Sequence, residues 1–95
     1  MKEITEEKLA NAFAVTEKAI ATVRISAPEN SHLHKAAQDY LEMAQSYVSD
    51  AKHFQKKGDY INAFGSVYYA HGWLDAGARL GLFDVGHDST LFTVD

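Results

Sequence analysis

The sequence contains no cysteine. Disulfide bonds, zinc–thiolate sites and thiol nucleophiles are therefore excluded, and a reducing compartment is the natural environment for the chain. The sequence also lacks any run of about eighteen apolar residues, which is the length needed to span a bilayer. Its charged start, from Met1 to Glu7, carries no apolar signal-peptide stretch. We therefore expect a cytoplasmic protein with no membrane partner.

Basic side chains are in the minority. Nine Lys and Arg face thirteen Asp and Glu, which gives a formal net charge of −4. This sign disfavours nucleic acid as a partner, because nucleic acid attracts clustered Lys and Arg. Hydrophobic residues make up 46% and charged residues 23%, the balance of an ordinary globular protein. Ninety-five residues fit a single domain over 1–95.

Proline occurs once, at Pro28, where it separates two helical patterns. Before it, apolar and small residues recur at three- and four-residue steps, as on one face of an α-helix. These residues are Leu9, Phe13, Thr16, Ile20, Val23 and Ala27. Thr5 is the best N-cap, because Glu6 and Glu7 then lie in the first turn, at the positive end of the helix dipole. We predict a first helix over about residues 5–26.

The second helix is predicted over about residues 31–57. Asn30 or Ser31 can cap its start, just after the proline. Lysines gather in its last turns, where positive charge suits the helix dipole. Gly58 follows as a residue able to take the left-handed conformation that ends many helices.

The third helix is predicted over about residues 60–80, with Asp59 as its N-cap. So short a connection makes the second and third helices an antiparallel hairpin. From residue 82 the helical periodicity stops, residues 86–89 look like a turn, and the apolar end either frays or docks in extended form. Its apolar residues are Leu91, Phe92 and Val94. The predicted fold is all-α, a three-helix up-down-up bundle with a short non-helical C-terminal tail.

The third helix is apolar on two sides. Its main face should pack on the other helices and consists of Tyr60, Ala63, Phe64, Val67, Ala70, His71, Leu74 and Ala78. A second set, nearly opposite, consists of Tyr69, Trp73, Ala76 and Leu80. A helix that is apolar most of the way round is central in its domain or covered by another chain. We therefore predict that the second set is an interaction face.

Small residues form a stripe between these two faces, at Gly65, Gly72 and Ala76. A glycine within a helix costs about 1 kcal/mol relative to alanine, so two of them need a compensating reason. Three reasons stay open: close approach of the first helix, close approach of a helix from a second subunit, or a ligand against the bare backbone. A ligand there would have His71 and Asp75 beside it.

The histidines invite a metal hypothesis, which their spacing argues against. His32 and His34 are two residues apart and point to different sides of a helix. Hairpin geometry separates the Asp50/His53 pair from His71 by roughly 10 Å along the helix axis, too far for a shared ion. His71 is better interpreted as a hydrogen-bonded core residue. We identify no catalytic residue, no metal ligand and no cofactor-binding residue.

One stretch resembles a known family. The residues are Asp50-Ala51-Lys52-His53-Phe54, Lys57-Gly58-Asp59, Asn62-Ala63, Tyr69 to Gly77 and Arg79-Leu80-Gly81-Leu82-Phe83. They look like a small archaeal family known as domain of unknown function 357. The resemblance covers about residues 40–84, whereas residues 1–30 carry no matching motif. It implies an archaeal source and a short helical bundle, and it supplies no activity.

The sequence favours a non-enzymatic role. We predict a helical interaction module that forms a homo-oligomer or binds a protein partner. The alternative is a small ligand-binding protein or enzyme, with a pocket beside the stripe of Gly65 and Gly72 on the third helix.

Overall fold

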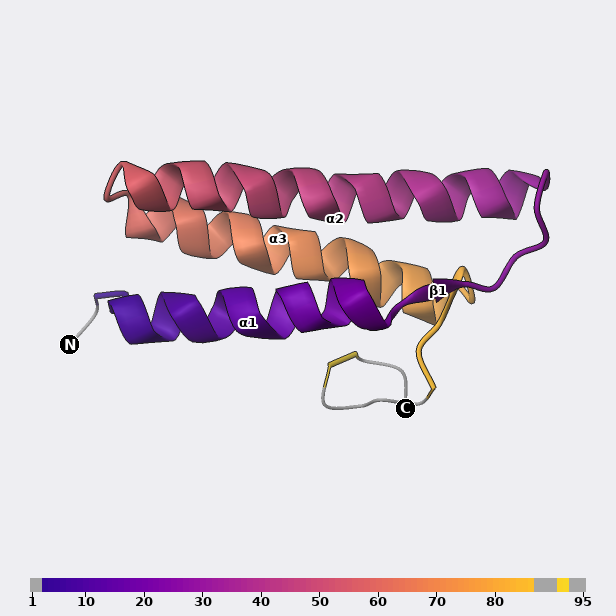
Figure 1. The fold of residues 1–95 in the computed structure, drawn as a ribbon, viewed down its shortest axis with the longest axis horizontal. Helices are drawn as coiled ribbons and strands as arrows, with labels where there is room; N and C mark the ends of the chain where they lie inside the picture. Colours follow the sequence, from indigo (N-terminus) through magenta and orange to yellow (C-terminus); the bar gives the residue numbers. More distant parts are fainter. Residues whose placement is uncertain (1–2, 87–90, 93–95) are drawn as a thin grey trace.

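Three helices and a two-stranded sheet make up the fold, which a computed structural model describes over residues 3–86 and 91–92. The elements are α1 (Glu6–Thr22), β1 (Arg24–Ile25), α2 (His32–Lys56), α3 (Tyr60–Arg79) and β2 (Phe83–Asp84). The helices run up, down and up, and α3 lies between α2 and α1 (Figure 1). The predicted all-α, up-down-up bundle is confirmed.

The helix ends follow the sequence signals closely. Thr5, Ser31 and Asp59 are the N-caps, and each side chain accepts a 3.1 Å hydrogen bond from the backbone N–H three residues later. These bonds satisfy donors that have no partner within the helix. Gly58 and Gly81 follow α2 and α3 with φ of 77° and 78°, which glycine adopts without steric cost. The residues at positions 58 and 59 therefore determine the turn of the hairpin by their own local chemistry.

The first helix is shorter than predicted. It ends at Thr22, not at residue 26, because Val23 leaves the helix with ψ of 142°. The next two residues form β1, which pairs antiparallel with β2. The backbone N–H of Ser26 then donates to the carbonyl of Leu82 at 3.0 Å. Val23 and Ala27 therefore continue the apolar spacing without continuing the helix, since backbone bonds to the C-terminal segment replace the helical ones.

Small residues at seven-residue spacing hold α2 and α3 together. On α2 they are Ala37, Ala44 and Ala51, and on α3 they are Ala63, Ala70 and Gly77. All of them are buried. The antiparallel order of the hairpin brings Ala51 opposite Ala63 and Ala44 opposite Ala70, whereas Gly77 is covered by the ring of Phe83. Since interaxial distance depends on the side chains at the contact, this pattern lets the two backbones lie close.

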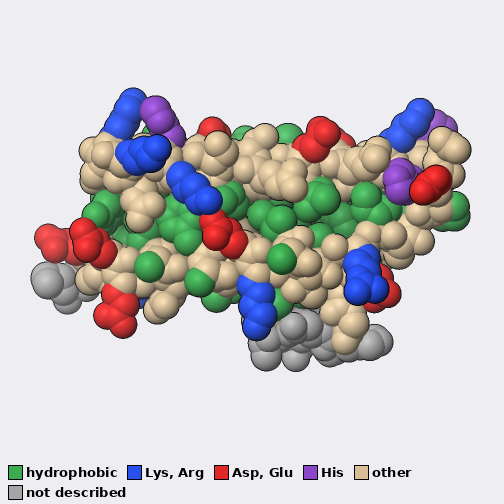
Figure 2. All heavy atoms as spheres, in the orientation of Figure 1, with side chains coloured by type: hydrophobic (Ala, Val, Ile, Leu, Met, Phe, Trp, Pro, Cys, Tyr) green, Lys and Arg blue, Asp and Glu red, His purple; other side chains and the backbone are tan. Residues whose placement is uncertain are grey.

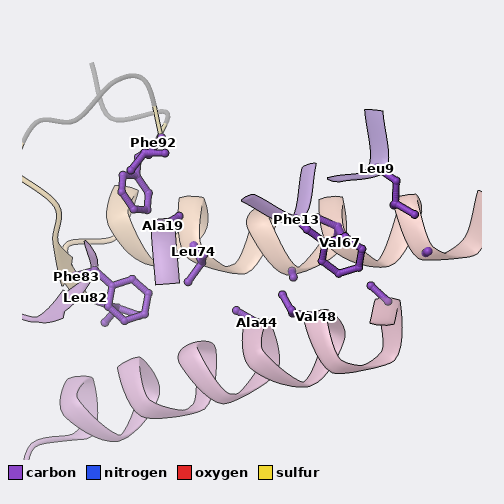
Figure 3. Close-up of a cluster of buried hydrophobic side chains, with 14 of the residues drawn as sticks. Leu9, Phe13, Ala19, Ala44, Val48, Val67, Leu74, Leu82, Phe83 and Phe92 are labelled. Carbon is purple, nitrogen blue, oxygen red and sulfur yellow. The ribbon is translucent and has the colours of Figure 1, made fainter. Parts of the chain in front are cut away.

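The hydrophobic core runs along α3 on the side that faces α1 and α2 (Figure 3). Leu9 and Phe13 of α1 cover one end of it. At the other end the segment after α3 closes the core. The buried residues there are Leu82, Phe83, Leu91 and Phe92. Of the predicted docking tail, Leu91 and Phe92 are thus buried; Val94 and the turn at 87–89 lie outside the described residues.

The molecule is elongated. Its extents are 45 × 24 × 17 Å and its radius of gyration is 14.0 Å, against about 12 Å for a compact domain of this length. α1 and α2 touch little, and an ion pair of 2.8 Å between Lys52 and Glu17 joins them. Figure 2 shows hydrophobic side chains along the seam between these two helices, with charged side chains on both rims. Among the described residues, no helix combines the length and apolar character of a membrane span.

Candidate functional site

The side of α3 that neither α1 nor α2 covers is exposed and apolar, and at Tyr68 it borders the groove between α1 and α3. We call it the outer face of α3 and define it as Ile61, Gly65, Tyr68, Gly72 and Ala76, with Tyr69 and Leu80 at its edge. All seven residues are exposed. The exposed fractions of the large ones are 75% for Ile61, 62% for Tyr68, 53% for Tyr69 and 66% for Leu80.

Over residues 60–74 the outer face also lacks charge, and the exposed Arg79, seven residues after Gly72, lies at its C-terminal end. Between Asp59 and Asp75 the sequence has no Asp, Glu, Lys or Arg. A surface helix ordinarily carries charged or polar residues opposite its apolar stripe. On α3 the stripe opposite the core is instead built from aliphatic, aromatic and glycine residues. Exposed apolar patches of this kind mark interaction sites.

The glycine stripe lies open on this face. A Cβ atom built on Gly65 or Gly72 would meet nothing within 4 Å among the described residues. The expectation that the first helix approaches these glycines is therefore wrong, because α1 packs on a different side of α3. The close-packed glycine is Gly77, which the stripe did not include: a Cβ there would lie 2.5 Å from Cδ2 of Phe83.

The predicted interaction face divides into two parts. Tyr69, Ala76 and Leu80 are exposed, whereas Trp73 is half-buried in the seam between α3 and α2. Its ring meets Tyr40 of α2 edge to face, with centroids 5.0 Å apart. The Trp73 Nε1–H is buried without an acceptor among the described residues.

A chain of aromatic contacts continues along the same seam. Tyr69 lies edge to face with Tyr47 of α2 at 4.5 Å and with Trp73 at 6.2 Å. Such pairs contribute beyond their buried area. A shallow groove of about 270 Å³ opens beside them. It is lined by Tyr40, Tyr69, Gly72, Trp73 and Ala76. Trp73 therefore belongs both to the hairpin packing and to the border of the outer face.

His71 is hydrogen-bonded, as predicted, but it is half-buried and lies beside the hydrophobic core, not within it. Its Nε2 lies 2.5 Å from the carbonyl oxygen of Leu91, and its Nδ1 lies 3.1 Å from Oγ1 of Thr16. A carbonyl can only accept, so Nε2 carries the hydrogen and Nδ1 accepts from Thr16. The ring also stacks on Phe92 at 6.2 Å. Asp75 lies 4.0 Å from Nε2, which is already engaged with Leu91.

A second groove, of about 280 Å³, lies between α1 and α3. Its lining is mostly apolar and consists of Lys8, Asn11, Ala12, Val15, Thr16, Phe64, Val67, Tyr68 and His71. The predicted ligand stripe is thus split, because His71 lines this groove and Gly72 lines the other. Within the described residues, no three His, Asp or Glu side chains gather as metal ligands would.

Family comparison supports the resemblance seen in the motifs. A sequence profile of the family described as "Protein of unknown function (DUF357)" matches residues 7–83. The chain belongs to the DUF357 family. A comparison with curated proteins finds no match, and neither does a comparison with solved structures. The family description names no activity, so DUF357 membership leaves the function to be argued from the surface.

The DUF357 match is longer than the motifs indicated. It begins at residue 7 and therefore includes α1, whereas the motif comparison found nothing over residues 1–30. The whole outer face of α3 lies inside the matched span. Leu91 and Phe92, which cover His71, lie beyond its end at residue 83.

Two residues of the outer face were missed by sequence reasoning. Ile61 and Tyr68 are its most exposed residues together with Leu80, and neither was assigned to a face. They are seven residues apart, as are Gly65 and Gly72. This shared spacing places all four on one side of a helix and was the available signal.

Proposed function

We propose that the protein is a non-enzymatic helical interaction module, which binds another protein surface through the outer face of α3. The observation that carries the proposal is the exposure of Ile61, Tyr68, Tyr69 and Leu80 on a helix that has no Asp, Glu, Lys or Arg over residues 60–74. Aromatic residues are enriched at the energetic centres of protein interfaces. The composition, with its net charge of −4 and no cysteine, fits a cytoplasmic protein partner better than nucleic acid.

A stable interface also needs a rigid base. The outer face belongs to α3, and the opposite side of α3, which includes Val67 and Leu74, is buried against α1 and α2. The small-residue pairing of the hairpin fixes the orientation of α3 relative to α2. Little conformational entropy is therefore lost when the outer face binds, apart from that of its own side chains.

The test uses tagged chains isolated from the native cells and sized by gel filtration. Tyr68→Lys places a charge at the centre of the outer face and should abolish any complex that contains the chain. Leu33→Lys is the matched control, because Leu33 is 60% exposed on α2 and lies outside the face. We expect the complex in the wild type and in Leu33→Lys. A chain that migrates alone, or a complex that tolerates Tyr68→Lys, would contradict the proposal.

One observation favours a second candidate, a ligand-binding protein. The groove between α1 and α3 joins an apolar lining to the Thr16–His71 pair and is about the size of a small pocket. Native mass spectrometry of the freshly purified chain separates the two candidates, since it reports subunit number and retained mass together. A monomer that carries extra bound mass, lost in His71→Ala, would favour the ligand-binding function.

A further inference from the structure

We infer that the surface bound by the outer face of α3 is the same face of a second copy, with the two α3 helices antiparallel. This inference rests on the function proposed above and names its partner. It follows from three observations: a helix contact already present in the chain, the placement of charges at the two ends of α3, and the surface area of the chain.

The hairpin shows how α3 packs against an antiparallel helix. On its inner side, Ala63 and Ala70 are small, lie seven apart and face small residues of α2. On its outer side, Gly65 and Gly72 are also small and seven apart. Only the first set is covered in the described chain. The outer side thus repeats the spacing that α3 uses to approach a neighbouring helix closely.

The outer face is complementary to itself in an antiparallel register. When Gly65 faces Gly72 of the second copy, the symmetry axis passes between Tyr68 and Tyr69, and Ile61 faces the small Ala76. Each large side chain near the centre then has an aromatic or small neighbour. A two-fold pair must present the same patch on both copies, and this patch meets that condition.

Charges at the ends of α3 select the antiparallel orientation. Asp59 caps the N-terminus, and Arg79 lies in the last turn. In the antiparallel register Arg79 comes near Asp59 of the second copy, and the helix dipoles oppose each other favourably. In a parallel pair Asp59 would face Asp59 and Arg79 would face Arg79. Tyr68 would then also face Tyr68.

The chain exposes enough surface for one such interface. The chain exposes 6310 Å², whereas a compact monomer of 95 residues exposes about 5,400 Å². The excess is close to the roughly 800 Å² that each partner contributes to a standard interface.

Cysteine cross-linking tests the register, because the native chain has no cysteine to interfere. The recombinant full-length chain is oxidised mildly as three separate variants: Tyr68→Cys, Ile61→Cys and Leu33→Cys. Near the symmetry axis, Tyr68→Cys should form a disulfide-linked dimer at least about tenfold faster than Leu33→Cys, which reports random collision. Ile61→Cys should be as slow as Leu33→Cys, since two copies of residue 61 lie roughly 20 Å apart along the helix axis. Mixing Ile61→Cys with Ala76→Cys should restore fast cross-linking.

The outcomes separate this inference from the function on which it rests. Fast self-linking of Ile61→Cys would overturn the antiparallel pair, whereas the interaction module would stand. A recombinant chain that stays monomeric in sedimentation equilibrium would overturn the second copy as partner. If the complex from native cells nevertheless depends on Tyr68, the partner is another protein and the proposed function survives. If that complex tolerates Tyr68→Lys, both fail.

Discussion

At the scale of single residues, Gly77 is the glycine on which the fold depends. The ring of Phe83 packs directly on its backbone and so holds β2 against α3. We expect Gly77→Ala to lower the free energy of unfolding, because overpacking costs about 1–3 kcal/mol and outweighs the gain of about 1 kcal/mol in helix propensity. Urea unfolding followed by circular dichroism measures the change.

Gly72→Ala is the matched control for that substitution. It lies on the same helix in open space, so in dilute, monomeric protein it should raise the free energy of unfolding by up to about 1 kcal/mol. Equal effects of the two substitutions would show that Phe83 does not press on Gly77.

The ionisation of Tyr60 depends on a contact between α1 and α3. Its hydroxyl donates a 2.8 Å hydrogen bond to Glu6, and this bond raises the pKa of Tyr60, with smaller contributions from burial and from the Glu6 charge. The bond needs the protonated phenol. Its contribution to stability is therefore complete below about pH 10 and is lost as the pH rises through the raised pKa.

Ultraviolet absorbance titration measures this pKa as the difference between the wild type and Tyr60→Phe, because the chain has five tyrosines. Glu6→Gln should return the pKa of Tyr60 towards its ordinary value, since it removes the carboxylate that accepts the bond. Glu7→Gln removes a neighbouring exposed carboxylate and should leave the titration as in the wild type. An unchanged curve in Glu6→Gln would mean that the bond does not form in solution.

At the scale of elements, the helix starts were predictable and the strands were not. Thr5, Ser31 and Asp59 carry local chemistry that fixes a helix start wherever the rest of the chain lies. β1 and β2 are two residues each and pair across more than fifty residues of sequence. So short a strand has no periodicity to detect. Because Val23 keeps the apolar spacing of α1, the pattern also hid the end of that helix.

A buried hydroxyl group, that of Thr16, links α1 to His71 of α3, which in turn bonds to the C-terminal segment. Thr16 is 2% exposed, and its Oγ1 donates to Nδ1 of His71 at 3.1 Å. Thr16→Val keeps the branched shape and removes the donor. We expect a loss of about 1–3 kcal/mol in the free energy of unfolding, because His71 Nδ1 is left unsatisfied.

Thr22→Val is the control for this element. The Thr22 hydroxyl donates to the carbonyl of Lys18 in the same helix, at the surface, so its removal should change the free energy of unfolding by less than about 0.5 kcal/mol. Chemical unfolding of both variants under the same conditions gives the comparison. A Thr16→Val protein as stable as Thr22→Val would indicate that His71 finds another donor.

At the scale of the whole molecule, the sequence identified α3 as the helix with two apolar sides but not what covers each. Tyr69, Ala76 and Leu80 are exposed as an interaction face should be, whereas Trp73 packs on Tyr40. Helical spacing gives the direction of a side chain about its own helix axis. It does not give the position of a neighbouring helix, which depends on pairings such as that of Ala44 with Ala70.

Association through the outer face should couple stability to protein concentration. If folded chains pair and unfolded chains do not, mass action raises the midpoint of thermal unfolding by about 3–5 °C for each tenfold increase in concentration. Tyr68→Lys should remove this dependence while leaving the helical circular dichroism unchanged, because residue 68 is 62% exposed within the chain.

Differential scanning calorimetry over a hundredfold concentration range measures the coupling. Leu33→Lys should keep the wild-type slope, since Leu33 is similarly exposed but lies on α2, outside the outer face. A slope that persists in Tyr68→Lys would place the contact elsewhere, and the seam between α1 and α2 is the next apolar surface to substitute. A midpoint independent of concentration in the wild type would show that folding is completed within one chain, which leaves the outer face of α3 available to a different protein.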